Sequence, residues 1–345
     1  MRAAVFHEYG GPLGVEEVAD PAPPRDGVVL EVGATGICRS DWHAWMGHDP
    51  GVSPPHVPGH ELAGTVVATG PDARGDWQGA RVTVPFCLGC GRCGPCRAGE
   101  TQLCDDDYQP GFTGWGSFAR YVALPRADLN LVRLPAALGF VEAAALGCRF
   151  MTAFAAVCVH GRPAEGDWVA VHGCGGVGLS AVMVAVAAGA RVAAVDIDAA
   201  KLALARDLGA EVTLDARDGD PAAAVLEATG GGAQVSLDAL GSAATCATSV
   251  GSLRKRGRHV QVGLLLAGER SVPVPMSRVI SHELELVGVH GMAVRHYPTL
   301  LDAIAAGRLA PSRLVGATVG LEQAGAELAA MSGFARHGAT VIASF

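Results

Sequence analysis

The stretch VAVHGCGGVGLSAV, residues 169–182, constrains the fold more than any other part of the sequence. It places Gly173, Gly175 and Gly178 in a G-x-G-x-x-G pattern between an apolar strand and an apolar helical segment. In such a loop the first glycine makes a tight turn, the second admits a pyrophosphate, and the third lets the helix pack closely. Glycine is abundant here, so the flanking strand and helix carry the argument. They predict a dinucleotide-binding βαβ unit.

An acidic residue follows at the distance that such a unit requires. Asp196 ends the apolar segment 191–196, close to the ~20 residues after the loop at which an acid binds the adenosine ribose hydroxyls. A carboxylate there repels a 2′-phosphate, so NAD is favoured over NADP. The alternative is a glycine-rich turn without a ligand. The candidate cofactor-binding residues of this unit are Gly173, Gly175, Gly176, Val177, Gly178, Asp196 and Lys201.

Two patterns divide the chain, whose 345 residues are too many for one hydrophobic core. Up to about residue 147, short alternating strands such as 27–32 and 80–85 are separated by Gly, Pro and Asp turns, which is typical of a β-rich, barrel-like domain. From Asp167, strands alternate with helices, which predicts an α/β fold with a doubly wound parallel sheet. The expected boundaries are 1–149 for the β-rich domain, 150–290 for the dinucleotide-binding domain, and 291–345 for a C-terminal return.

Charge and hydropathy exclude two classes of partner. The net charge is −8, and binding to nucleic acid needs a basic face. The short basic run 254–256 is interpreted as a solvated helix end. The most apolar stretch, 179–195, is interrupted by Gly189 and Arg191 and is too short to span a bilayer, and no segment is typical of a signal peptide. We therefore expect a cytoplasmic protein with neither nucleic-acid nor membrane partners.

Five of the ten cysteines lie between residues 87 and 104. In a reducing compartment such a cluster indicates metal binding and not disulfides. Four of the five have spacings x2, x2 and x7, which suit a closed tetrahedral zinc site, whereas the bacterial iron–sulfur run has x3 before its last cysteine and Pro after it. Cys87 is the odd one out and is interpreted as a bystander. The predicted ligands are Cys90, Cys93, Cys96 and Cys104.

A second set of metal-ligating residue types is scattered over three segments, GICRSDWH, VPGHELAG and AALGCRFMTA. Two thiolates and one imidazole would leave a fourth zinc position open for water or substrate, as a catalytic zinc requires. Spacing alone does not assemble this set, because His7, His48 and His56 compete for the same roles. The three segments supply Cys38, Ser40, Asp41, His43, His60, Glu61 and Cys148.

Taken together, these segments resemble the zinc-dependent alcohol dehydrogenases of the medium-chain dehydrogenase/reductase superfamily. The resemblance covers nearly the whole chain, from GICRSDWH and PGHE through the four-cysteine lobe to GCGGVG and VDID. It implies a GroES-like catalytic domain, a Rossmann domain that binds NAD(H), and two zinc ions per chain, in a homotetramer or homodimer. It assigns the catalytic zinc to Cys38, His60 and Cys148, and the structural zinc to the four-cysteine lobe.

The resemblance also implies roles for the neighbouring residues. Glu61 approaches the metal during exchange, Asp41 accepts a hydrogen bond from a ligand histidine, and Arg39 reaches the cofactor pyrophosphate. Zinc activates the alcohol oxygen, hydride passes to the nicotinamide, and the proton leaves through Ser40, a ribose hydroxyl and His43, whose unperturbed pKa of ~6.5 suits that task. Trp42, Phe86 and Trp115 are candidates for the substrate channel, or else core residues; aromatic walls would favour apolar or aromatic alcohols.

Three other functions remain open at this point. A polyol or amino-alcohol dehydrogenase of the sorbitol or threonine type would share the fold, the zinc and NAD, and would differ in the polarity of its pocket. A zinc-independent quinone or enoyl reductase would lack the Cys38, His60 and Cys148 ligands. A non-enzymatic protein that binds zinc and a nucleotide would keep the ligands and the proton path without using them.

Overall fold

The structure, a computed structural model, describes residues 1–265, 271–333 and 338–345. It divides into two compact units. Unit 1 contains residues 1–151, 291–305 and 310–345, and unit 2 contains residues 152–290 and 306–309. The sequence-based boundary at 149–150 lies two residues before the first break between the units. Within the described residues, no helix combines the length and the apolar character needed to cross a bilayer.

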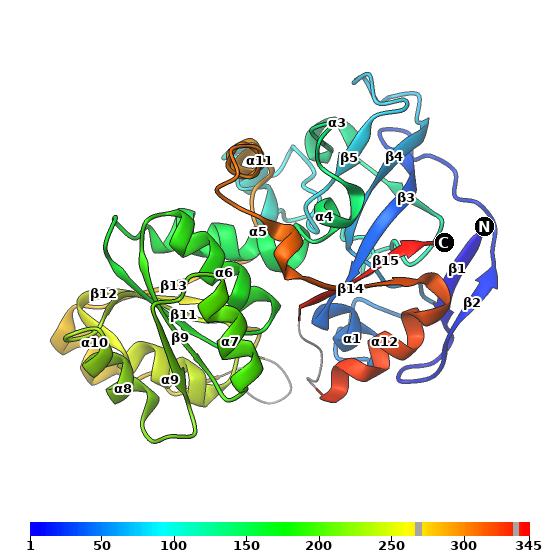
Figure 1. The fold of residues 1–345 in the computed structure, drawn as a ribbon. Coiled ribbons are helices and arrows are strands. Elements are labelled where there is room, and N and C mark those ends of the chain that lie inside the picture. Colours follow the sequence, from blue (N-terminus) through cyan, green and yellow to red (C-terminus); the bar gives the residue numbers. More distant parts are fainter. Residues whose placement is uncertain (266–270, 334–337) are drawn as a thin grey trace. The chain divides into compact units, whose positions relative to one another are not determined.

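Unit 1 is the β-rich unit (Figure 1). In the part of it that the structure describes, seven strands form one sheet in the order β14-β15-β3-β4-β5-β7, with β6 paired to β3, and β1 pairs with β2. Its strands are β1 (Arg2–Phe6), β2 (Leu13–Glu17), β3 (Val28–Ile37), β4 (Glu61–Thr69), β5 (Arg81–Thr83), β6 (Tyr121–Leu124), β7 (Val132–Arg133), β14 (Val315–Gly320) and β15 (Ala339–Ser344). Its helices are α1 (Arg39–Trp45), α2 (Gly94–Arg97), α3 (Ala127–Asn130), α4 (Phe140–Ala144), α11 (Tyr297–Ala305) and α12 (Ala324–Ala330).

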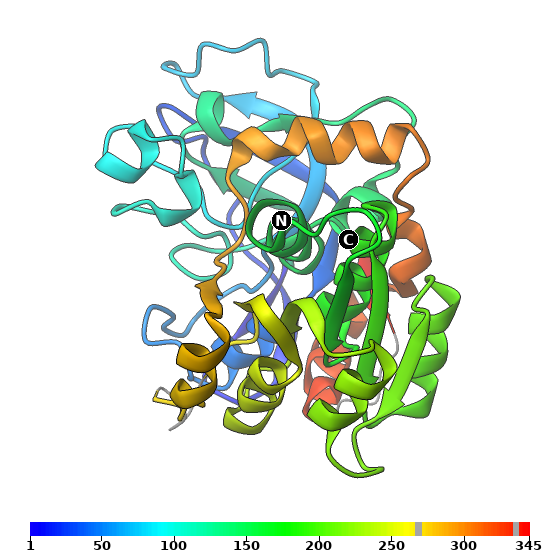
Figure 2. The same ribbon diagram turned by 90° about the vertical axis from the view of Figure 1, so that its left-hand side faces the viewer.

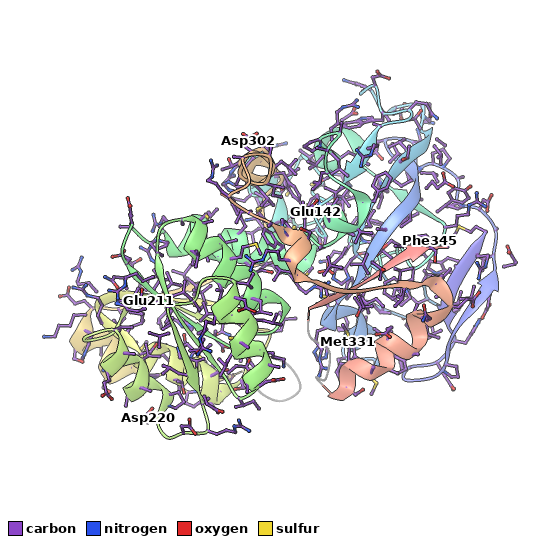
Figure 3. All side chains as sticks on the ribbon, viewed as in Figure 1. Glu142, Glu211, Asp220, Asp302, Met331 and Phe345 are labelled. Atoms are coloured by element: carbon purple, nitrogen blue, oxygen red, sulfur yellow. The ribbon has the colours of Figure 1, made fainter. Side chains whose placement is uncertain are left out.

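The C-terminal segment returns to unit 1 and completes its core. Strand β15 pairs antiparallel with β3, from Thr340 opposite Ile37 to Ile342 opposite Thr35. Phe345, labelled in Figure 3, packs against the apolar clusters on which β1 and β3 rest. Helix α11, seen end-on in Figure 1 and from the side in Figure 2, belongs to this returning segment.

Unit 2 is a parallel sheet with helices packed on it. Across its described residues, six strands lie in the order β10-β9-β8-β11-β12-β13, which is the 3-2-1-4-5-6 order of the Rossmann fold. The strands are β8 (Trp168–His172), β9 (Arg191–Asp196), β10 (Val212–Asp215), β11 (Ala233–Asp238), β12 (Leu253–Gln261) and β13 (Glu285–Gly288). The helices are α5 (Cys148–Phe154), which enters from unit 1 and continues as a π-helix (Ala155–Gly161), α6 (Gly176–Ala187), α7 (Ala199–Asp207), α8 (Pro221–Ala228), α9 (Ala243–Gly251) and α10 (Met276–His282). The predicted fold class, a Rossmann sheet with a β-rich second domain, is confirmed.

The interpretation of the basic run 254–256 as a helix end is wrong. Helix α9 ends at Gly251, and the run lies inside β12. Between Leu253, which pairs with Ala233, and Arg258, which pairs with Val235, the chain bulges out of the sheet register. Arg256 has φ +63° there, and the three basic side chains are exposed. The bulge allows three consecutive charged side chains to reach solvent from a strand, because the usual alternation of faces is broken.

Candidate metal centres and cofactor-binding loop

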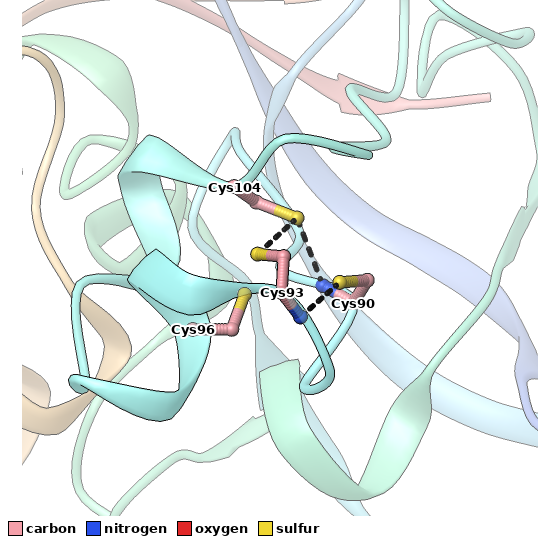
Figure 4. Close-up of side chains that lie close together, drawn as sticks. All are labelled: Cys90, Cys93, Cys96 and Cys104. Atoms are coloured by element: carbon pink, nitrogen blue, oxygen red, sulfur yellow. Dashed lines mark hydrogen bonds between the residues drawn. The ribbon is translucent and has the colours of Figure 1, made fainter.

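The four-cysteine lobe gathers the predicted structural zinc ligands (Figure 4). The Sγ atoms of Cys90, Cys93, Cys96 and Cys104 all lie within 4.8 Å of one another. Backbone N–H groups point at two of these sulfurs: those of Arg92 and Cys93 donate to Cys90 Sγ, and those of Cys90 and Asp106 donate to Cys104 Sγ, at 3.2–3.4 Å. Cys87 is buried and lies outside the set.

The charge of the lobe fits a divalent cation. The N–H of Arg92 lowers the pKa of the Cys90 thiol to about 6, whereas burial raises the pKa of Cys104 to about 12. A bound cation would offset the cost of burial at Cys104 and would favour the thiolate form that zinc binds. Arg126 anchors the loop from outside, because its guanidinium donates to the carboxylate of Asp106 at 2.9 Å.

The scattered set is assembled by one strand pair and one helix start. Gly36 at the end of β3 pairs with Glu61 at the start of β4. Cys38 therefore leaves one strand where His60 enters the other, and Cys148 begins α5. Ligand atoms of Cys38, His60, Glu61 and Cys148 all lie within 4.8 Å of one another. The strand register brings Cys38 beside His60 and Glu61, and the start of α5 adds Cys148, so sequence spacing alone could not assemble the set.

The geometry of His60 fits a metal ligand. Its Nδ1 lies 2.8 Å from Oδ1 of Asp41, which is fully buried and also accepts hydrogen bonds from the backbone N–H groups of Cys38 and Gly59. In the neutral imidazole, which is the form that binds a metal, Asp41 as an acceptor would place the proton on His60 Nδ1 and leave a lone pair on Nε2. Within the described residues, that buried Nε2 has no hydrogen-bond partner. A zinc ion bound by Cys38, His60 and Cys148 would satisfy it.

Glu61 is held by an arginine that sequence reasoning missed. The carboxylate is fully buried, and Oε1 accepts from Nε and the backbone N–H of Arg149 at 2.9 and 3.1 Å, while Oε2 pairs with Nη2. Burial opposes the charge of Arg149, but the facing Glu61 carboxylate raises its pKa above the ordinary value. Glu61 is thus kept beside the ligands as half of a bidentate ion pair, where its approach to a metal would require breaking contacts to Arg149.

Helix α1 carries the other predicted residues of this region. Ser40 Oγ lies 3.8 Å from Cys38 Sγ. The Arg39 guanidinium lies 4.0 Å from the Trp42 ring centroid and donates to the carbonyl of Met331, a residue labelled in Figure 3. His43 is half-buried, and burial together with the Arg39 charge lowers its pKa to about 4. The unperturbed value assumed for His43 from sequence does not apply.

Aromatic rings stand edge-on to His60. The Phe86 ring centroid lies 6.2 Å from that of His60, and the Phe112 centroid lies 5.1 Å away. Phe86 was a candidate for the substrate channel or else a core residue, and it is largely buried beside His60. Phe112 was missed, because nothing in its local sequence distinguishes it from other aromatic residues. Trp115 is 40% exposed, and Trp42 Nε1 donates to Ser332 Oγ at 3.1 Å.

The glycine loop of unit 2 is shaped to receive an anion. Gly173 has φ +92°, and a side chain on Gly178 would collide with the Gly173 carbonyl. A side chain on Gly175 would meet open space. Gly175 is the N-cap of α6, and among the described residues no side chain caps this helix end. The free backbone N–H groups at the start of α6, together with the positive end of its dipole, therefore fit a pyrophosphate. Gly176, Val177 and Gly178 form the first turn of this helix. Cys174 is buried, which raises its pKa to about 12 and suits a filler.

Asp196 ends β9, and its carboxylate binds both the glycine loop and the turn that precedes α7. Its Oδ2 accepts from the N–H of Cys174 at 2.6 Å, and its Oδ1 accepts from the N–H of Asp198 at 2.9 Å. A carboxylate has further lone pairs, which remain suited to ribose hydroxyls. Lys201 Nζ lies 3.8 Å from Asp198 Oδ2, near the start of α7. The loop, the acid and the lysine thus lie at the carboxyl edge of the sheet, where ligands of such folds bind.

Comparison with known families matches both parts of the chain. Residues 24–136 match the alcohol dehydrogenase GroES-like domain, and residues 176–306 match the zinc-binding dehydrogenase family. The first range includes the four-cysteine lobe, and the second begins inside the glycine loop.

Individual proteins extend the match over the full length. An alcohol dehydrogenase of Moraxella sp. is 39% identical over 76% of this chain and 78% of its own. An NAD-dependent alcohol dehydrogenase of Sulfurisphaera tokodaii is 30% identical over 99% of both chains. The crystal structure of benzyl alcohol dehydrogenase from Acinetobacter calcoaceticus superposes with a TM-score of 0.92 at 26% identity, covering 100% of this chain and 99% of its own.

Proposed function

Because the chain belongs to the zinc-dependent alcohol dehydrogenases of the medium-chain dehydrogenase/reductase superfamily and is an oxidoreductase acting on alcohols, we propose that it interconverts alcohols and aldehydes or ketones with NAD and two zinc ions. One observation carries this proposal: Cys38, His60 and Cys148 converge, with the buried Nε2 of His60 unpartnered among the described residues. A zinc-independent reductase would have no use for such a set.

The chain's own residues prepare this site. When bound, zinc would act as a Lewis acid on the substrate oxygen, and NAD would accept hydride. Asp41 fixes the His60 tautomer, and Arg149 holds the Glu61 carboxylate in place, although burial raises the pKa of Glu61. Ser40 and His43 on α1 take the proton that alcohol oxidation releases. Asp196 favours NAD over NADP by its charge, Lys201 adds a contact to the ribose, and Arg39 is proposed to meet the pyrophosphate.

The substrate class is proposed from the aromatic edges. Phe86 and Phe112 flank His60, which favours apolar or aromatic alcohols over polyols. A polyol or amino-alcohol dehydrogenase is the second candidate, since a sorbitol dehydrogenase is 34% identical to this chain over 84% of it. The ligand thiolates need a reducing environment, so we place the enzyme in the cytoplasm, and we expect a homotetramer or homodimer.

A substrate panel tests the proposal. We expect NAD-dependent oxidation of benzyl alcohol and medium-length primary alcohols, with much lower kcat/KM for sorbitol and threonine and with NADP. Asp196→Asn keeps one carbonyl acceptor but removes the charge, and should lower the NAD-to-NADP preference about tenfold, equivalent to ~1.4 kcal/mol of charge repulsion. Equal or better turnover of sorbitol would favour the second candidate. Absence of NAD reduction with every alcohol in zinc-loaded protein would contradict the proposal.

A further inference from the structure

The C-terminal end of α1 brings a second histidine onto His43. The N–H of Gly47 donates to the carbonyl of Ala44 at 3.0 Å, and the N–H of His48 donates to the carbonyl of His43 at 2.9 Å. Gly47 has φ +77°, the left-handed conformation that glycine adopts most easily. This pair of hydrogen bonds is the Schellman motif, which sets the residue after the glycine against the residue five positions earlier. The turn thus fixes His48 beside His43.

The contact between these two side chains is polar. In a Schellman motif the corresponding contact is commonly hydrophobic. Here Nδ1 of His43 lies 2.9 Å from Nδ1 of His48, with ring centroids 5.2 Å apart. The Trp42 ring stands edge-on to both imidazoles, with centroids 4.9 and 5.6 Å away. His43 is half-buried, whereas His48 is exposed. The pair therefore connects a half-buried position on α1 to the solvent.

Two imidazole nitrogens at hydrogen-bond distance constrain the tautomers of both rings. When both rings are neutral, one Nδ1 must carry the proton and the other must accept it. If His43 Nδ1 is the donor, His43 Nε2 has a free lone pair and His48 carries its proton on Nε2. That arrangement can take up a proton at His43 Nε2 and pass one on at Nδ1.

The charges around His43 oppose a lasting imidazolium. Burial, the Arg39 guanidinium and His48 lower its pKa to about 4, and the negative charge of the Cys38 thiolate opposes them only in part. A half-buried histidine beside an arginine is therefore poorly suited to store a proton near neutral pH. It is suited to transfer one, provided that a neighbour accepts it at the same time.

The geometry points to His48 as the outer member of a two-histidine proton exit; this inference rests on the proposed dehydrogenase function. The released proton forms a bond with His43 Nε2 while the bond from His43 Nδ1 to its hydrogen breaks and a new one forms at His48 Nδ1. His48 then gives its Nε2 proton to water. His43 stays neutral throughout and is left as the tautomer that can return a proton inward when a carbonyl is reduced. Exchange with water restores the first tautomer.

Ring ¹⁵N NMR of the histidines tests the shared proton without any turnover. At about pH 8, where free histidine is neutral, we expect one Nδ1–H ring and one Nε2–H ring for the pair in the wild-type chain. Spectra of His43→Gln and His48→Asn variants assign the signals. Two Nε2–H rings in the wild-type protein would overturn the inference, because no proton would then lie between the two Nδ1 atoms.

First-turnover kinetics test the transfer. In His48→Asn, the amide oxygen can still accept from His43 Nδ1 but cannot pass the proton on, so the first-turnover rate of NADH formation with benzyl alcohol should fall about tenfold near pH 7. In His48→Ala, added imidazole should restore most of the rate. His7→Asn, at an exposed histidine paired with Glu16, is the matched control and should match the wild type.

The outcomes separate the two proposals. A wild-type rate in His48→Asn at every pH from about 6 to 9, with only a lower Tm, would show a purely structural contact and overturn the proton exit. Failure of imidazole to rescue a slowed His48→Ala would count against it equally. A zinc-loaded wild-type chain that oxidises no alcohol would instead contradict the proposed function, whatever the NMR spectra show.

Discussion

The two sulfur-rich centres of unit 1 differ most in what surrounds their sulfur atoms. Around the four-cysteine lobe, backbone N–H groups from the same loop point at sulfur, and the ligands come from one short stretch. Around Cys38, His60 and Cys148, the neighbours are charged: Asp41 and Glu61 are fully buried, and Arg149, whose side chain is 12% exposed, pairs with Glu61. We propose that the first arrangement would close a metal site with four ligands, whereas the second would supply three ligands and leave one coordination position for substrate. Removing parts of each centre should therefore have different consequences.

The largest effect is expected from Cys148→Ser. Loss of a catalytic ligand should remove several kcal/mol of transition-state stabilisation, which is roughly a thousandfold or more in kcat. The fold should persist, because the four-cysteine lobe is intact. Benzyl alcohol oxidation with NAD and circular dichroism measure the two quantities. Cys158→Ser, at an exposed cysteine, is the control and should behave as the wild type. A folded Cys148→Ser variant with full activity would remove Cys148 from the site.

Arg149→Met should destabilise the protein by about 3–5 kcal/mol, because it leaves the Glu61 carboxylate buried without its partner. The apparent free energy of unfolding in urea, with zinc present, measures this loss. The double variant Glu61→Gln with Arg149→Met removes both charges and should regain most of the stability. If the double variant were as unstable as Arg149→Met alone, the ion pair would not be the cause.

Asp41→Asn should weaken zinc binding at the scattered set about 10- to 100-fold, since the amide nitrogen cannot accept the hydrogen bonds that the carboxylate accepts. Chelator competition, followed as zinc released per chain, measures the change. The four-cysteine lobe serves as an internal control, because its zinc should be released as in the wild type. Equal weakening of both zinc ions would indicate general unfolding and not a local role of Asp41.

The smallest effect on turnover is expected from Cys93→Ser. It should remove one zinc and lower the Tm, because a structural zinc contributes directly to folding. At a temperature well below that Tm, kcat per folded chain should remain within about twofold of the wild type. A loss of activity as large as that of Cys148→Ser, in folded protein, would erase the distinction between the two centres.

The same contrast explains what the sequence could predict. The lobe and the glycine loop are local: cysteine spacing indicated the first, and glycine spacing followed by Asp196 indicated the second. The scattered ligands depend on the pairing of Gly36 with Glu61 and on the position of the α5 start, so only the resemblance to a family brought them together in advance. Arg149 could not be recognised, because the sequence does not distinguish an arginine paired with a buried carboxylate from an exposed one until the distant partner, Glu61, is known. The His43–His48 contact follows from a helix end whose glycine is visible in the sequence, but the low pKa of His43 depends on Arg39 and burial.

The number of zinc ions per chain tests the central claim most directly. Elemental mass spectrometry on protein purified without chelator measures it. Two zinc ions per chain are predicted, one in the four-cysteine lobe and one held by Cys38, His60 and Cys148. A single zinc per chain that Cys93→Ser removes, with none gained on incubation with zinc, would contradict the account, because the scattered set would then bind no metal.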